Sequence, residues 1–465
     1  MGSASLWTGE AGAVTSSLDL DRELVDAVST RFAARLRGVT DSDSAYWDYS
    51  GIKSNSNPLA YFQYPAMMVP RMQGDIIKAL VEVFPRTKRT FDPFAGSGTV
   101  LTESLKLGLS SIALDVNPMA ILLCKVKAAG FRELDATSAL KEVLQSSAKD
   151  RAECIEITYH NREKWFCAEA LRELSKVCRT IKLIEDLELR QLLWMAFAEA
   201  VRINSNSRTS TYKLHIRDAD DIQRRSSGAR DRIVNAMERV VAMYTHNAQA
   251  LANAGSTKAG RFKKSVTIRN HDIREPVGRY WADALITSPP YGDNHTTVTY
   301  GQHSFLPLCW IPFLDIDPTL DTRLVENTHS IDSASLGGRK EGSALKQTKI
   351  IQKSNSLRAL LASPLLNVDA KQRLSIFFHD LDVALENSLR ILRAGSPIVL
   401  TLGNRCVGGQ KVPMDSIVRE LLENNNCVFI DTHNRAIPTK RMAHRNQSAG
   451  TMLTETLLIM RGPSN

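Results

Sequence analysis

Around Phe91 the chain begins to alternate short apolar runs with longer stretches of helical periodicity, and this alternation limits the fold more than any other feature. The strand-like runs lie at residues 89–91, 111–114, 265–269, 284–287, 397–402, 428–432 and 456–460. Several of them end in Gly, Pro or Asp, which terminate strands and form turns. Strands separated by helices pair in parallel within an open sheet that helices cover. We therefore predict an α/β fold with one seven-stranded sheet.

The size and composition of the chain indicate a globular protein with a large core. Its 465 residues are 43% hydrophobic and 23% charged, which suits one elaborated domain or two to three smaller ones. No apolar run is long enough to span a bilayer, and the N-terminus lacks the basic and apolar segments of a secretory signal. We therefore expect a cytoplasmic protein that does not act at a membrane.

Seven cysteines are scattered through the chain without a CxxC pair. A structural zinc site or a disulfide framework needs paired or regularly spaced cysteines. The cysteines are therefore expected to be small buried residues, and we predict no metal site.

A long helical stretch, rich in Leu, Glu, Arg and Ala, separates the first two strand-like runs from the other five. We predict that residues 134–261 form a helical insertion between two parts of the core, residues 46–133 and 262–465. Residues 1–45 carry no chemical motif and are expected to be a peripheral N-terminal segment. Within the insertion, residues 204–230 are too rich in Ser, Asn and Arg for a core helix, so we expect a surface loop or a mobile arm.

The first strand-like run leads into a glycine turn, DPFAGSGT at residues 92–99, and then into a helix. Glycines let the backbone approach a ligand, and the first turn of a helix offers free N–H groups to an anion. A phosphate-binding P-loop would need a Lys that is absent, and a dinucleotide fingerprint would need Gly where the chain has Leu101. The next strand-like run ends in Asp115, where an acid can accept hydrogen bonds from both hydroxyls of a ribose.

DPFAGSGT and the following LDVNP, residues 114–118, resemble the first two motifs of S-adenosylmethionine-dependent DNA amino-methyltransferases, which act on cytosine N4 or adenine N6. The resemblance implies a Rossmann-like seven-stranded class I methyltransferase core with S-adenosylmethionine as cofactor. It places the glycine turn and residues 61–77 against the methionine part, Asp115 at the ribose and Asp272 near the adenine. The cofactor-binding residues expected on this basis are Tyr64, Pro65, Asp92, Phe94, Ala95, Gly96, Ser97, Gly98, Thr99, Asp115, Asn117 and Asp272.

A second motif, Ser288-Pro289-Pro290-Tyr291, follows the strand-like run at residues 284–287. Two consecutive prolines end the strand and fix the turn. The exocyclic amine of a base is a weak nucleophile because its lone pair is conjugated with the ring, so it needs hydrogen-bond acceptors. If the Ser288 hydroxyl and the Pro289 carbonyl accept the two amino hydrogens, the nitrogen can attack a methyl group in line. Tyr291 would stack on the base once it has rotated out of the duplex. We predict all four residues of the motif to be catalytic.

The residue before the two prolines favours cytosine N4 as the target. SPPY resembles the catalytic motif of N4-cytosine enzymes, whereas adenine-N6 enzymes more often carry Asp or Asn at the position of Ser288. Cytosine-C5 enzymes resemble one another in using a Pro-Cys nucleophile, and no cysteine of this chain follows a proline. The alternatives are an adenine-N6 DNA methyltransferase, an RNA or tRNA guanine-N2 methyltransferase, and a catalytically inactive nucleic-acid-binding homologue.

Charge and family resemblance together indicate the partners. A net charge of +9 is compatible with a polyanion, and the resemblance implies double-stranded DNA. Enzymes of this family resemble one another in serving restriction-modification or other defence systems, so a cognate restriction nuclease or another defence protein is a further expected partner. The target-recognition region is expected either in the helical insertion or at residues 321–366. The basic run at residues 440–445 is a candidate phosphate contact.

Overall fold

A single sheet forms the centre of the protein. The computed structural model describes residues 29–38, 47, 61–65, 67–129, 133–159, 161–278, 280–291, 299–338, 343–437 and 454–464. Within these residues the strands of the sheet are β1 (Arg89–Asp92), β2 (Ser110–Asp115), β5 (Val266–Asn270), β6 (Ala284–Thr287), β7 (Pro397–Gly403), β10 (Val428–Ala436) and β11 (Thr454–Arg461). Each of them lies where the sequence predicts a strand, and β10 and β11 are longer than predicted.

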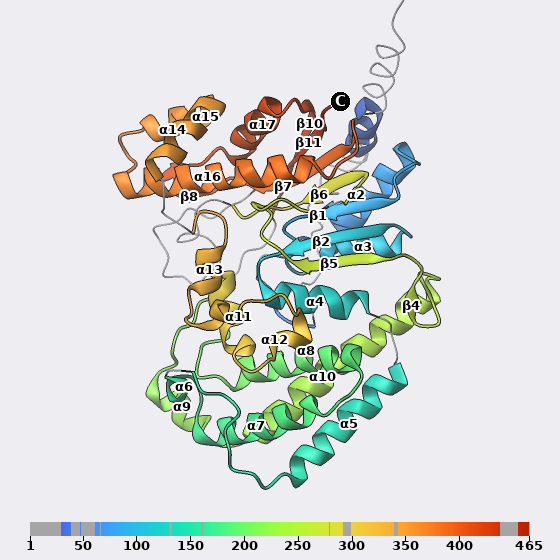
Figure 1. Cartoon of the computed structure of the whole chain (residues 1–465), viewed down its shortest axis with the longest axis vertical. Coiled ribbons are helices and arrows are strands. Elements are labelled where there is room, and N and C mark those ends of the chain that lie inside the picture. The colour runs from blue at the N-terminus through green and yellow to red at the C-terminus, as the bar shows by residue number, and fades with distance from the viewer. Residues whose placement is uncertain are drawn as a thin grey trace, which may run out of the picture.

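The strands lie in the order β10-β11-β7-β6-β1-β2-β5. Neighbouring strands are parallel except at β11, which runs antiparallel to both β7 and β10. The chain first adds β2 and β5 on one side of β1 and then returns to add β6 and β7 on the other side (Figure 1). This order, with one reversed strand, is that of the Rossmann-like class I methyltransferase fold, so the predicted fold class is confirmed.

Side chains that alternate along the strands supply a core on each face of the sheet. Leu285 of β6 belongs to a core shared with α16 (Val368–Leu389) and α17 (Met414–Asn424). Its neighbour Ile286 belongs to the opposite core, with α2 (Pro70–Val83) and α3 (Thr99–Lys106). Residues 29–38 are helical and join this second core through Phe32. The sheet is therefore covered by helices on both faces, which leaves the ends of its strands as the place for a ligand.

A helical body lies beyond α4 (Pro118–Ala128), next to the β5 edge of the sheet (Figure 1). Two thirds of the residues of its central helix, α8 (Leu187–Asn204), are buried, and the helix packs against α10 (Ala229–Asn253), α4 and α11 (Tyr300–Leu308). The body consists of α5 (Glu133–Lys149), α6 (Arg162–Trp165), α7 (Ala168–Lys182), α8 (Leu187–Asn204), α9 (Ala219–Arg224) and α10 (Ala229–Asn253). The division of the chain at residues 134–261 stays a prediction.

The polar tract at residues 204–230 is more ordered than expected. Its first four residues, 204–207, are buried at the end of α8. The backbone N–H of Asn206 donates to the carbonyl of Trp165, and Ser207 pairs with Ile216 in an isolated β-bridge. The expectation of a loop or arm on the surface is therefore wrong for this part of the tract, because packed neighbours satisfy its polar groups.

The remaining elements are short or lie around the sheet. They are β3 (Thr257–Lys258), β4 (Arg261–Phe262), β8 (Cys406–Val407), β9 (Gln410–Lys411), α12 (Phe313–Ile316), η3 (Thr322–Val325), α13 (Ser330–Ala334), α14 (Ser343–Lys353) and α15 (Asn355–Ala362). No helix of the described residues is long and apolar enough to cross a membrane. The basic run at residues 440–445 and most of the predicted N-terminal segment lie outside the described residues.

Candidate active site

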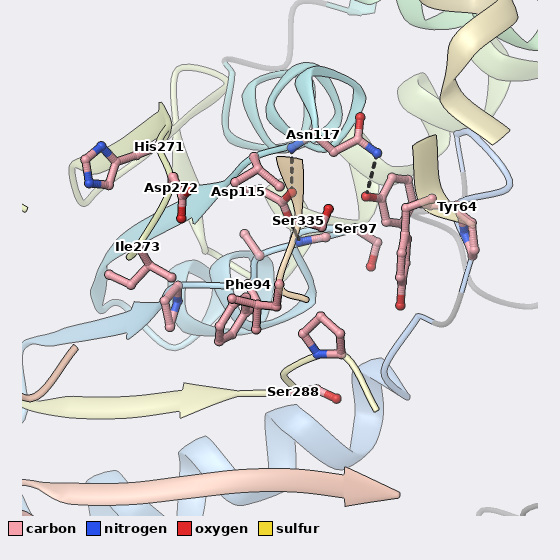
Figure 2. Close-up of a pocket in the computed structure, with 18 of the residues that line it drawn as sticks. Tyr64, Phe94, Ser97, Asp115, Asn117, His271, Asp272, Ile273, Ser288 and Ser335 are labelled. Atoms are coloured by element: carbon pink, nitrogen blue, oxygen red, sulfur yellow. Dashed lines mark hydrogen bonds between the residues drawn. The ribbon is translucent and has the colours of Figure 1, made fainter. Parts of the chain in front are cut away.

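The carboxyl ends of β1 and β6 meet where the order of the strands reverses. These two strands are neighbours, but β1 is followed by β2 on one side and β6 by β7 on the other. Thr287 ends β6, and its Oγ1 donates to Oδ1 of Asp92, the last residue of β1, over 2.6 Å. Ligands of open α/β sheets bind in the crevice at such a reversal. A pocket lies there (Figure 2).

Most of the predicted site residues line this pocket. They are Tyr64, Pro65, Phe94, Ala95, Gly96, Ser97, Asp115, Asn117, Asp272, Ser288 and Pro290. Asp92, Gly98, Thr99, Pro289 and Tyr291 are not part of the lining. The sheet thus brings together predicted residues that are far apart in the sequence, from Tyr64 to Pro290.

The glycine turn brings the main chain against the pocket. Gly96 and Gly98 have φ angles of 48° and 71°, in the left-handed region that glycine adopts without steric cost. A Cβ on Gly98 would lie 2.9 Å from Sγ of Cys124, so α4 packs directly on the turn. Nζ of the buried Lys127 donates to the carbonyl of Ser97 over 2.6 Å and holds the turn from behind. Sequence reasoning missed Lys127, because a lysine on an otherwise apolar helix carries no motif.

Asp115 ends β2 and faces the pocket beside the glycine turn. The N–H of Gly96 donates to its Oδ2 and the N–H of Asn117 to its Oδ1, each over 2.8 Å. Burial raises the pKa of Asp115 to about 6, against the lowering effect of these backbone N–H groups. Each carboxylate oxygen keeps a further lone pair. Asp115 can therefore also accept hydrogen bonds from the hydroxyls of a ribose.

Asn117 joins Tyr64 to the second strand and to α11. Its Nδ2 donates to the Tyr64 hydroxyl over 3.1 Å and to Oγ of Ser304 over 2.9 Å (Figure 2 shows the first bond). Its Oδ1 accepts from the N–H of Met119 and caps α4. This side chain therefore holds three segments at one end of the pocket.

Asp272 and Ile273 follow β5 and form the other end of the pocket (Figure 2). Arg274 donates to the Asp272 carboxylate from Nε over 2.9 Å and from Nη2 over 2.6 Å. Ile273 is buried, and together with Phe94 and Leu336 it makes this end apolar. A carboxylate next to apolar walls suits a flat heterocycle that carries an amino group.

The loop after β6 places Ser288 and Pro290 in the pocket wall. Oγ of Ser288 and the hydroxyl of Tyr291 lie 2.9 Å apart and share one hydrogen bond. Burial raises the pKa of Tyr291 well above its usual range, so this hydroxyl is neutral. Ser288 therefore holds Tyr291 beside the pocket.

Asp92 lies where β1 and β6 meet and is almost completely buried. Its Oδ1 accepts from Thr287 and from the N–H of Phe94, whereas its Oδ2 has no hydrogen-bond partner among the described residues. Burial raises the pKa of Asp92 to about 7. Its contacts indicate that it sets the relative position of the two strand ends.

Nine lining residues were not singled out from the sequence. They are Met68, Pro93, Val116, His271, Ile273, Tyr300, Ala334, Ser335 and Leu336. Pro93 and Val116 lie inside the two cofactor motifs and Met68 within residues 61–77, so the motifs themselves were the available signal, and Ile273 adjoins the predicted Asp272. Residues 334–336 lie within the region predicted for target recognition, which therefore has one edge in the pocket. No cluster of three or more His, Cys, Asp or Glu that could hold a metal ion is found in the described part of the chain.

Comparisons with known proteins agree on the class of enzyme. A family model described as D12 class N6 adenine-specific DNA methyltransferase matches residues 74–252. The chain is 25% identical over 472 residues to the Type II methyltransferase M.MvaI of Kocuria varians, covering 96% of this chain and 98% of that protein. It is 32% identical over 120 residues to the Type II methyltransferase M.MjaII of Methanocaldococcus jannaschii, 22% of each chain.

A solved structure, the rRNA methyltransferase aviRa from Streptomyces viridochromogenes, aligns with 88% of this chain and 93% of that chain. The TM-score is 0.28 and the identity 11%. The family match at residues 74–252 includes the glycine turn and Asp115 but ends before Ser288.

Proposed function

Because the chain belongs to the S-adenosylmethionine-dependent DNA amino-methyltransferases, we propose that it methylates N4 of cytosine within a specific sequence of double-stranded DNA. The observation that carries this proposal is the position of Ser288. This serine is the first residue after β6, and it lies in the same pocket that the glycine turn and Asp115 line. A base amine placed at Ser288 would thus lie beside a cofactor held by the ends of β1 and β2.

The pocket fits the three parts of the cofactor. The main chain at Gly96 and Ser97 would offer polar groups to the methionine part, and Asp115 would accept from the ribose hydroxyls. Phe94 and Ile273 would cover the faces of the adenine, and Asp272 would accept from its amino group. S-adenosylmethionine supplies a methyl group that its positively charged sulfur makes electrophilic.

The catalytic loop then prepares the amine. When the Ser288 hydroxyl donates its hydrogen bond to the Tyr291 hydroxyl, the Ser288 oxygen keeps lone pairs that can accept one amino hydrogen of the base. The Pro289 carbonyl accepts the other, which draws the nitrogen lone pair out of conjugation. With the cofactor held by the glycine turn and Asp115, the freed lone pair would take up its methyl group, S-adenosylhomocysteine would leave, and the amine would release one proton to solvent. No residue of the chain needs to form a covalent bond to the base.

Adenine N6 is the second candidate, and the family model favours it. Its description names N6-adenine enzymes, but the matched residues end before the catalytic loop. The same acceptors would serve either amine, since both are conjugated with their rings. Our preference for cytosine therefore depends on Ser288, which stands where N6-adenine enzymes more often carry Asp or Asn.

Product analysis tests the reaction and the base together. The purified protein is incubated with methyl-labelled S-adenosylmethionine and unmethylated genomic DNA, and the nucleosides are identified by mass spectrometry. We expect N4-methylcytosine, and N6-methyladenine would establish the second candidate. Label in RNA alone would identify an RNA methyltransferase, and S-adenosylmethionine binding without transfer to either nucleic acid would identify an inactive homologue.

We also propose a cognate restriction nuclease, or another defence protein, that acts on the same DNA sequence. The support is that both relatives are Type II methyltransferases. Once the methylated sequence is known, DNA modified by the protein should resist cleavage by a nuclease specific for that sequence. Equal cleavage of modified and unmodified DNA would contradict this proposal.

A further inference from the structure

A second hollow lies between the polar tract and α11, apart from the cofactor pocket. Arg208, Thr209, Tyr212 and Lys213 of the tract line it from one side, and His303 of α11 lines it from the other. In Figure 1, α9 and α11 mark this side of the molecule, below α13. None of these residues belongs to the motifs that the proposed function uses.

The tract is fixed in place around this hollow. The N–H of Arg208 donates to the carbonyl of His215, and Ser207 pairs with Ile216, so residues 207–216 form a closed loop. The N–H of Leu214 also donates to Oε1 of Gln302 in α11 over 3.3 Å. The loop therefore keeps a defined position relative to α11, as a binding surface requires.

The two cations of the loop differ from their charged neighbours. Arg202 is paired with Glu199 and Arg217 with Asp221, each at 2.8 Å. Arg208 and Lys213 are exposed and have no ion pair among the described residues. Two unpaired cations with a threonine hydroxyl between them are suited to a phosphate group.

His303 adds a polar atom that still lacks a partner. It is 8% exposed, and its Nε2 has no hydrogen-bond partner among the described residues. Burial, with the nearby charge of Arg202, lowers the pKa of His303 to about 4, so the ring is neutral at pH 7. Tyr212 covers the ring edge-on, with centroids 5.4 Å apart. The wall of the hollow therefore presents an acceptor deep inside and cations at its rim.

The hollow is close to the active site along α11. Tyr300 lines the cofactor pocket, and His303 follows it by one helical turn, roughly 4.5 Å along the axis. We propose that the hollow binds a backbone phosphate of the DNA strand whose target base enters the active site. Arg208 and Lys213 bind the phosphate oxygens, and a water on the phosphate donates to His303 Nε2. This inference rests on the proposed function, because it takes DNA as the substrate.

The test removes the two cations together and compares the result with a matched loss of charge elsewhere. The variant is R208A/K213A, and the control is K263A/K264A, two exposed lysines next to β4 on the opposite side of the molecule (Figure 1). Affinity for a DNA duplex that contains the methylated sequence is measured by fluorescence anisotropy over a range of salt concentrations, with S-adenosylhomocysteine present. We expect R208A/K213A to bind about tenfold more weakly and to reduce the salt slope by roughly 1.

The control should stay within about twofold of the wild type. KM for DNA should rise in R208A/K213A, while the KM for S-adenosylmethionine, kcat and Tm stay unchanged. An unchanged salt slope in R208A/K213A, or an equal loss in the control, would overturn the inference and leave the proposed function intact. Failure of the wild type to methylate DNA would instead refute the proposed function, and this inference with it.

Discussion

The cofactor pocket has two walls that are built in different ways. The first wall consists of strand ends, with Phe94, Gly96 and Asp115 following directly from β1 and β2. The second wall consists of Tyr300 in α11 and residues 334–336 at the end of α13. Main-chain bonds hold the first wall, such as those from the N–H of Ala95 to the carbonyl of Leu114 and from the N–H of Gly96 to Asp115.

Buried carboxylates hold the second wall. Asp332 accepts from the N–H groups of Gly301 and Gln302 at the start of α11. Asp380 of α16 accepts from the N–H of Gly337 and from Arg274, which also binds Asp272 at the end of the first wall. The first wall is thus a property of one sheet, whereas the second depends on two aspartates that bind main-chain N–H groups and, at Asp380, Arg274 of the segment after β5. We expect substitutions in the first wall to have large effects on cofactor binding and catalysis, and substitutions in the second wall to have smaller ones.

The largest effect is expected from Ser288, and a serine of the second wall serves as its control. Ser288→Ala removes an acceptor for the base amine, so kcat should fall on the order of 10²–10³-fold. Affinity for S-adenosylmethionine should change by less than about twofold, since the glycine turn and Asp115 remain. Ser335→Ala, on the second wall, is the control and should keep kcat. Single-turnover methylation and calorimetry measure the two quantities, and similar kcat losses in both variants would remove the distinction.

The next effect concerns the cofactor. Asp115→Asn replaces a carboxylate that accepts from Gly96 and is placed to accept from ribose, so affinity for S-adenosylmethionine should fall about 10–100-fold. At saturating cofactor, kcat should stay close to that of the wild type. The matched variant Asp332→Asn weakens the second wall and should reduce affinity less. Calorimetric titration measures the affinity of both variants for S-adenosylmethionine. A larger loss of affinity in Asp332→Asn than in Asp115→Asn would reverse our assignment of the walls.

These two walls also mark what the sequence could and could not predict. All strands of the sheet and the residues of the first wall follow from local patterns, because a glycine turn after a strand determines its own geometry. Tyr300, Ser335 and Leu336 were missed, since their positions depend on how α11 packs on α8 and how α13 packs on α11. The buried start of the polar tract was missed for the same reason. Its composition indicates exposure, but tertiary hydrogen bonds satisfy its polar groups.

A smaller effect should follow from separating the walls. Arg274→Met removes the bonds to Asp272, to Asp380 and to the carbonyl of Ala334. Because Asp380 is nearly buried, the free energy of unfolding should fall by about 2 kcal/mol, and cofactor affinity several-fold. The exposed pair at Arg35 is the control, and Arg35→Met should cost less than about 1 kcal/mol. Urea unfolding measures both, and equal losses would show that Arg274 makes no special link.

The pH dependence of stability should show the smallest effect, with opposite signs for the two walls. Burial raises the pKa of Asp92 to about 7, so the folded protein retains a proton that the unfolded chain loses near pH 4. Stability from this group therefore falls as pH rises from about 4 to 7. Burial alone would raise the pKa of Asp380 as well, but hydrogen bonds from Lys346 and Gly337 hold it below its usual range. Stability from Asp380 is therefore present above about pH 4 and is lost as pH falls below it.

Two variants separate these contributions in Tm measurements between pH 3 and 8. The Tm of Asp92→Asn should rise relative to that of the wild type as pH rises through 4–7. The substitution removes a carboxyl that becomes a buried charge with one unpartnered oxygen. The Tm of Asp380→Asn should lie furthest below that of the wild type above pH 5, and this difference in Tm should become smaller as pH falls. If the Tm of both variants changed with pH in the same way, the pKa values of the two carboxyls would be shifted in the same direction. In that case the two walls would differ in their position in the chain but not in the forces that hold them.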